Sequence, residues 1–352
     1  MNTHVIKLRR KEGTTADMLG KRFLSLNAAE RQIVYNTQNA AAREFSDKLM
    51  QYARNRHIVL SSFNGNNASD TQNIPGTIVF GDADREMIDL SWALLYSFRD
   101  NRRDVNDTFL IEDVYNAIAF EEYLSGAPVR LGDIQNGRGR FEYRILAGGF
   151  QYETLWAQDY PYWKIEDGML AMNTKYAMKL ERLAIETIVA SGGIAVSYDA
   201  AGANEVAKDV NTINAGALAI LSALYSDTRP DGEATEERIA RPRFFLLYNQ
   251  FSTRAMGRVN AAIAAGFGAP NEQTGGKELN YSVFPMPSPY VTGNSWSLVL
   301  PGRKNVFALK NDLMIYPQFD PYAAGGVDAR IGHGRFGCVR ADANQVAVLA
   351  TS

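Results

Sequence analysis

The acidic run GDADRE (residues 81–86) gathers more chemistry-bearing side chains than its surroundings. Asp82, Asp84 and Glu86 alternate along it, a spacing that suits a cation site or a pair of carboxylates acting as general acid and base. The same side chains also suit the first turn of a helix, where the helix dipole favours negative charge. We favour the helical interpretation and keep a metabolic enzyme that uses these three carboxylates as the alternative.

The histidines and the cysteine offer no second candidate. His4, His57 and His333 are isolated from one another, and none has a second metal ligand at helical or hairpin spacing. Cys338 shares a predicted strand face with Phe336, as a buried structural thiol does. We therefore predict no metal site.

Two glycine-containing segments resemble catalytic loops without completing them. GAPNEQTGGKE (268–278) has Asn271 where a phosphate-binding loop begins with glycine, and Glu278 where the loop needs a hydroxyl to hold magnesium. GNSWS (293–297) lacks the closing glycine of a nucleophile elbow. We predict no catalytic residue and no cofactor, and so a protein that is not an enzyme.

Composition indicates a globular chain. The 352 residues are 46% hydrophobic and 22% charged, enough for two or three lobes, and the net charge of −2 gives no overall attraction to nucleic acid or to an anionic membrane. A single cysteine excludes an internal disulfide framework. No apolar run is long enough to span a membrane, and no signal peptide is evident. We expect a soluble intracellular protein with no membrane partner.

We predict two long helices as the main supporting elements of the fold. Asn27 and Glu30 form a capping box that predicts a helix through about residue 56. Apolar residues at steps of three and four predict a second helix over 166–190, which SGG (191–193) should end. A helix of this length should support the fold as a rigid rod rather than pack as a short core helix.

The remaining elements are short. We predict a mixed α+β fold whose sheets draw strands from distant segments. The expected helices lie near 84–99, 108–124, 209–225 and up to 266, and the expected strands at 77–80, 243–249, 281–285, 296–300, 304–309, 313–317 and in a terminal pair within 334–352.

Aromatic residues concentrate in FEYRILAGGFQYETLWAQDYPYW (141–163), where they make up eight of 23 residues. Without a ligand site nearby, so much aromatic surface favours contact with a partner, although a core hairpin is the alternative. If the stretch packs on a neighbour, deletion of 143–160 should leave the rest of the chain folded. The predicted inter-subunit contacts are Phe141, Tyr143, Phe150, Tyr152, Trp156, Tyr160, Tyr162 and Trp163.

The order of these elements resembles the tailed-phage major capsid protein, the Hong Kong 97-like fold, over about residues 105–352. The resemblance implies peripheral and axial domains, and a segment in front whose fate, as scaffold or as a cleaved piece, stays open. The expected parts are an N-terminal extension with a long helix (1–104), an N-terminal arm (105–131), an extended β loop (132–164), a spine helix (165–193), an axial domain (194–315) and closing strands of the peripheral domain (316–352).

The resemblance implies a structural protein that self-assembles, as pentamers and hexamers, into an icosahedral phage head around double-stranded DNA. It implies a location in the virion after assembly in the host cytoplasm, with portal and cement or scaffolding proteins as partners. Residues 1–31 hold seven Lys or Arg against three Asp or Glu, so a DNA-facing role is expected for Lys7, Arg9, Arg10 and Lys11. An encapsulin-like nanocompartment shell is the alternative of the same fold.

Overall fold

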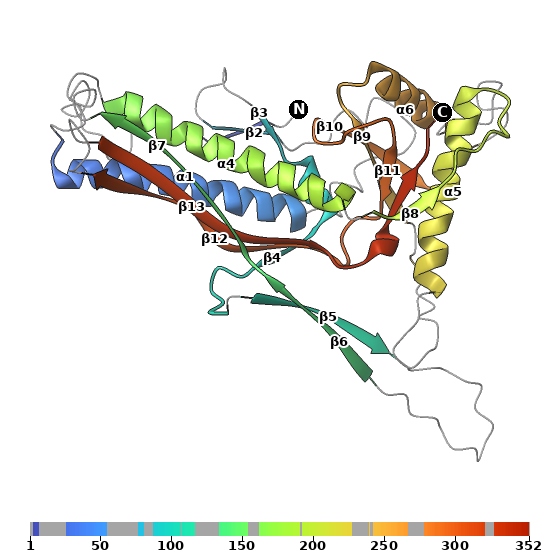
Figure 1. Cartoon of the computed structure of the whole chain (residues 1–352), viewed down its shortest axis with the longest axis horizontal. Helices are drawn as coiled ribbons and strands as arrows, with labels where there is room; N and C mark the ends of the chain where they lie inside the picture. Colours follow the sequence, from blue (N-terminus) through green and yellow to red (C-terminus); the bar gives the residue numbers. More distant parts are fainter. Residues whose placement is uncertain are drawn as a thin grey trace, which may run out of the picture. The chain divides into compact units, whose positions relative to one another are not determined.

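The structure is a computed structural model. It describes residues 3–6, 26–54, 77–80, 87–106, 108–116, 134–153, 162–190, 192–226, 239, 242–266, 278–320 and 327–351. The chain forms two compact units: unit 1 takes residues 1–105, 143–187 and 305–338, and unit 2 takes 106–142, 188–304 and 339–352. Each unit packs helices on a sheet (Figure 1), which confirms the predicted α+β class.

Unit 1 is built on two long helices and two sheets. The helices are α1 (Ala28–Arg54) and α4 (Tyr162–Ala190), with a short 3-10 helix, η4 (Ser91–Leu95). One sheet has the order β4 (Ser97–Asp100), β12 (Asn305–Asp320), β13 (Val327–Arg340), β7 (Arg144–Glu153), and the other the order β1 (Thr3–Ile6), β2 (Thr77–Phe80), β3 (Met87–Asp89). In the first sheet β4 runs parallel to β12, and β7 runs antiparallel to β13.

Helix α1 begins as its sequence predicts. The backbone amide of Asn27 donates to Glu30 Oε2 and that of Glu30 to Asn27 Oδ1, both at 2.8 Å, so the capping box is confirmed. The buried face of the helix packs on β12, where Asn39 Oδ1 accepts a 2.9 Å hydrogen bond from the amide of Ile315. The N-terminal helix is therefore part of the core of unit 1.

Helix α4 begins four residues earlier than predicted, at Tyr162, and measures about 43 Å at 1.5 Å per residue. The predicted glycine stop is confirmed by Gly192, whose φ of +68° only glycine adopts without strain. Arg340 donates to the carbonyls of Ile188 and Gly192, which satisfies acceptors that the end of the helix would leave open.

The two helices meet over one face of the four-stranded sheet. Leu313 and Ile315 of β12 share a core cluster with Tyr35 of α1 and Met169 of α4. Close approach of α4 to β13 depends on glycine, since a Cβ on Gly334 would lie 2.3 Å from the Tyr176 hydroxyl. Both helices thus bury the same face of the sheet.

Unit 2 packs two helices on a five-stranded sheet. The sheet order is β10 (Ser282–Ser288), β9 (Arg243–Asn249), β11 (Trp296–Val299), β14 (Val346–Leu349), β8 (Ile194–Val196), and the helices are α5 (Glu205–Ser226) and α6 (Thr253–Gly266), with the 3-10 helix η5 (Ala343–Gln345). An antiparallel ribbon of β5 (Thr108–Asn116) and β6 (Ile134–Glu142) also belongs to this unit.

Two predicted helices are wrong. Within 84–99 the described residues form β3, η4 and β4, and β5 replaces the start of the predicted helix 108–124. Strand β4 pairs with β12 across some two hundred residues, and such a long-range partner overrides the local pattern. The strands expected at 304–309 and 313–317 are one strand, β12.

The chain's last strands do not form the expected terminal pair. Strand β13 joins the four-stranded sheet, whereas β14 pairs with β11 and β8 in the other unit. The two contact units change over between Lys304 and Asn305. Assignment of axial and peripheral domains to these parts stays a prediction.

Candidate functional site

The described residues bring together no constellation for catalysis. The acidic run 81–86 lies outside them, as does His57, and within them no three His, Cys, Asp or Glu side chains could hold a metal ion. His333 stacks on Tyr316 with ring centroids 5.3 Å apart. Cys338 is buried, and burial raises the pKa of its thiol to about 11, so this thiol is protonated at neutral pH.

Of the two loop motifs, the structure describes only the second in full. Residues 268–277 lie outside the described residues, and in the second motif Gly293 makes a turn at φ +82° while Ser297 is buried within β11. Among the helices described, none is long and apolar enough to cross a membrane.

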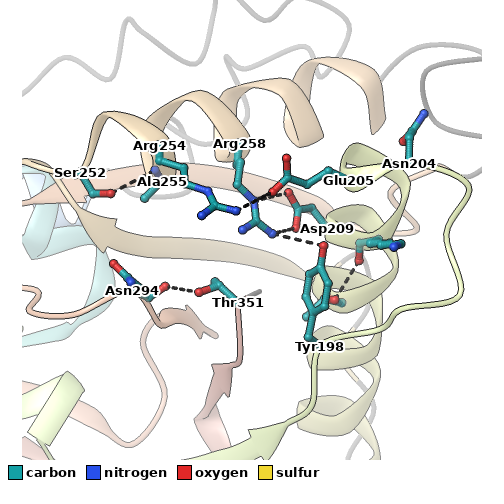
Figure 2. Close-up of polar contacts among 12 residues, drawn as sticks. Tyr198, Asn204, Glu205, Asp209, Ser252, Arg254, Ala255, Arg258, Asn294 and Thr351 are labelled. Atoms are coloured by element: carbon teal, nitrogen blue, oxygen red, sulfur yellow. Dashed lines mark hydrogen bonds and ion pairs between the residues drawn. The ribbon is translucent and has the colours of Figure 1, made fainter.

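A cluster of polar side chains joins α5 to α6 in unit 2 (Figure 2). Arg258 of α6 donates through Nε to Asp209 Oδ2 at 2.9 Å and through Nη2 to Asp209 Oδ1. Glu205 Oε1 lies 3.3 Å from the same Nε, and the guanidinium lies 5.6 Å from the Tyr198 ring centroid and 5.3 Å from that of Trp296. Arg258 and Asp209 are 9% and 1% exposed in their side chains.

This cluster has the chemistry of a structural clamp. Hydrogen bonds to Asp209 raise the pKa of Arg258, so the guanidinium stays charged and takes no part in proton transfer. The bidentate pair fixes both partners in one orientation, and aromatic rings cover the cation. It locks α6 onto α5.

The aromatic stretch divides between two sheets. Strand β6, with Phe141, pairs with β5, and strand β7, with Phe150, pairs with β13, so the described part of the stretch is not a core hairpin. Phe141 lies beside Phe109, with centroids 5.8 Å apart. The Phe150 ring packs closely on Gly168 of α4, because a Cβ on Gly168 would lie 2.8 Å from the Cζ atom of Phe150.

Tyr143 already has its contacts within the chain. It is 8% exposed, its hydroxyl accepts a 2.6 Å hydrogen bond from Asn101 Nδ2, and Lys310 Nζ lies 5.6 Å from its ring centroid. Burial raises the pKa of its hydroxyl. The structure does not describe the side chains of Tyr152, Tyr162 and Trp163, although these residues belong to β7 and α4. The remaining predicted residues lie outside the described residues: Trp156, Tyr160, Lys7, Arg9, Arg10 and Lys11.

The sheet of unit 1 exposes apolar side chains on the face opposite α1 and α4. Met314 and Tyr316 alternate on β12 with the buried Leu313 and Ile315, and their side chains are 38% and 41% exposed. Ile331 of β13 and Ile145 of β7 are exposed as well. Such a face suits contact with another protein. The sequence signal for this face is the run LMIY (313–316), which places apolar side chains on both faces of a strand.

No family model matches this sequence, and no curated protein matches it. Among solved structures, the capsid of Cyanophage P-SCSP1u is similar with a TM-score of 0.50 at 10% identity, covering 77% of this chain and 90% of that one. The fold is that of a phage capsid protein.

Two further capsids match at lower scores. The mature capsid of bacteriophage PhiM1 gives a TM-score of 0.47 at 11% identity and covers 76% of this chain and 89% of that one. The capsid of the empty GTA particle gives 0.47 at 14% identity and covers 82% and 98%.

Proposed function

We propose that this protein is the major capsid protein of a tailed phage and self-assembles, as pentamers and hexamers, into an icosahedral head that encloses double-stranded DNA. The observation that carries the proposal is the fold shared with the Cyanophage P-SCSP1u capsid over most of both chains. The exposed apolar face of the four-stranded sheet supports it, because copies in a shell bury surface that a monomer leaves in water.

The proposed partners follow from this role. Copies of the chain contact one another, DNA fills the interior, and portal and cement or scaffolding proteins complete the particle in the host cytoplasm. The candidate contacts are the eight aromatic residues of 141–163, except that Tyr143 is occupied within its own chain.

Assembly of the purified protein tests the proposal. We expect light scattering and electron microscopy to show closed icosahedral shells. Only monomers or dimers under every assembly condition would overturn a shell role.

The content of particles isolated from producing cells tests the DNA. We expect double-stranded DNA that nuclease does not degrade until the shell is opened. Particles filled instead with a cargo enzyme would assign the chain to the nanocompartment alternative.

A further inference from the structure

A cavity of about 710 Å³ opens in unit 1 between β7 and α4. This volume lies within the range of pockets that bind small molecules. The apolar side chains that line it include Leu146, Phe150, Met172 and Leu313. Every lining residue belongs to unit 1 of a single chain, so the cavity is complete without a second copy.

Glycine at position 148 keeps the cavity open. Gly148 of β7 lines the cavity, and a Cβ built on it would meet no atom within 4 Å. Gly332 of β13 differs, because a Cβ there would lie 2.8 Å from the terminal methyl group of Met172. Gly148 also lacks the positive φ of Gly192, so a larger residue can take its backbone conformation. The chain therefore leaves space at Gly148 that a side chain could fill.

The described polar side chains of the lining are hydrogen-bond donors of α4. Lys175 and Lys179, one helical turn apart, are exposed, so their ammonium groups lie at the solvent side of the cavity. The Tyr176 hydroxyl is buried close to Gly334 of β13 and has no hydrogen-bond partner among the described residues. Burial raises the pKa of this hydroxyl, so it keeps its proton at neutral pH. No acidic side chain is among the described lining residues.

These features select a ligand with three parts: a negative charge for the lysines, an apolar body for the lining, and a hydrogen-bond acceptor for the Tyr176 hydroxyl. We propose that the cavity binds an amphipathic carboxylate of the fatty-acid class that carries an oxygen atom near its apolar end. The carboxylate lies at Lys175 and Lys179, and the chain runs past Gly148 to Tyr176. Binding satisfies a buried donor that otherwise lacks a partner.

Isothermal titration of ω-hydroxydodecanoate, below its micelle concentration, into the purified unassembled chain tests the site. We expect saturable binding of one molecule per chain. Gly148→Leu should weaken binding by about tenfold or more, because the leucine side chain fills the space that the ligand needs. Gly257→Leu is the matched control and should bind as the parent does, since Gly257 of α6 also has open space at its Cβ position and does not line the cavity.

Circular dichroism during thermal unfolding shows whether both variants fold. Absence of saturable binding by the parent would overturn the inference. Equal affinity of the parent and Gly148→Leu would overturn it as well, because the ligand would then adsorb outside the cavity. Binding that the free chain shows and assembled particles lack would assign the cavity to a neighbouring copy and overturn the inference too.

Charge substitutions test the head group without altering the cavity wall, and so apply even if Gly148→Leu does not fold. Lys175→Gln with Lys179→Gln should lower the affinity for ω-hydroxydodecanoate severalfold and leave that for the uncharged dodecanediol unchanged. Lys48→Gln with Lys208→Gln removes the same charge outside the cavity and should change neither affinity. An equal loss for both ligands would overturn the assignment of the carboxylate to Lys175 and Lys179.

Tyr176→Phe tests the acceptor at the apolar end of the ligand. The variant should lower the affinity for ω-hydroxydodecanoate by about threefold to tenfold, as loss of one hydrogen bond does, and leave that for dodecanoate unchanged. Equal affinity of Tyr176→Phe and the parent for ω-hydroxydodecanoate would overturn the placement of the ligand oxygen at this hydroxyl. None of these titrations depends on assembly, so their failure leaves the proposed function standing.

Discussion

At the residue scale, buried charged side chains affect the free energy of unfolding. The guanidinium of Arg258 and the carboxylate of Asp209 are both buried, and each is the main partner of the other. Arg258→Met should lower the free energy of unfolding of unit 2 by about 3–5 kcal/mol, because it leaves the Asp209 charge buried without its counter-ion. Urea denaturation followed by intrinsic fluorescence measures the change.

Arg254→Met is the matched control for that prediction. Arg254 pairs with Glu205 at 3.2 Å, but the two side chains are 70% and 50% exposed. Exposed pairs contribute about 0–1 kcal/mol, so this variant should unfold close to the parent. Equal losses in the two variants would contradict the clamp described for Arg258.

Glu181 of α4 should make stability depend on pH. Burial, and then the charge of Asp89, raise the pKa of this carboxyl from 4.5 to about 8. The folded chain therefore keeps a proton that the unfolded chain releases, and this contribution is complete below pH 4.5 and is lost as the pH rises through 8. Glu181→Gln should raise the free energy of unfolding at pH 9 by on the order of 2 kcal/mol, and much less at pH 5.

Denaturation curves at the two pH values measure this difference. Glu186→Gln, five residues further along α4, alters an exposed carboxylate paired with Arg182 and is the control. If the gain from Glu181→Gln were the same at pH 5 and pH 9, the Glu181 carboxyl would not be the group that titrates.

At the element scale, the structure reverses the expectation for 143–160. Strand β7 pairs with β13 from Arg144 to Glu153, and Phe150 packs on the core of unit 1. Deletion of 144–153 should therefore abolish cooperative unfolding of unit 1, where the sequence led us to expect a folded remainder. Replacing 110–140, most of the β5–β6 ribbon, by a short Gly-Ser linker is the comparison and should leave unit 1 cooperative. Calorimetry measures both, and cooperative unfolding without 144–153 would restore the first expectation.

The sequence predicted those elements whose signals are local. Helix α1 follows from the Asn27–Glu30 capping box, and α4 from a long apolar stripe with a glycine stop. Both signals lie within one helix and do not depend on what the helix packs against.

The strands and the exposed surfaces could not be predicted from local signals, because they depend on residues that lie far apart in the sequence. Short apolar runs at 84–99 and 108–124 fit helix and strand alike, and only pairing with β12 and β6 decides them. The exposed face of Met314 and Tyr316 could not be located either, because it is defined by α1 and α4 covering the other face. The aromatic count indicated partner contact but could not show that Tyr143 bonds to Asn101.

At the scale of the whole molecule, each unit is assembled from separated segments. Unit 1 joins α1 to strands from the end of the chain, and α1 supplies Tyr35, whose ring lies 5.5 Å from the Arg330 guanidinium, and the buried Gln38, which bonds to Asn173. Removing the front of the chain through Arg54 would expose this core. The N-terminal extension could act as a scaffold or could be cleaved. Cleavage after α1 is therefore harder to reconcile with the fold.

The basic residues ahead of α1 suit the interior of a filled shell. Lys7, Arg9, Arg10 and Lys11 carry four positive charges within five residues, and contacts between such a run and DNA would be to phosphates, without reading of bases. Replacing all four by Gln should leave empty shells able to form and should lower DNA retention. The slope of the logarithm of the DNA-binding constant against the logarithm of salt concentration should become less steep by up to about 4, since each phosphate contact contributes about 0.9 to that slope.

Particle yield, packaged DNA and its release across a salt series measure the effect of the four substitutions. Glutamine at four exposed basic residues of the described chain, Arg43, Arg54, Arg103 and Arg254, is the matched control because it removes the same charge elsewhere. A local role for the N-terminal charges requires the first variant to lose DNA and the control to keep it. Intact shells with unchanged packaging and salt response in the first variant would exclude a DNA role for these four residues, and equal losses in both variants would assign the effect to net charge.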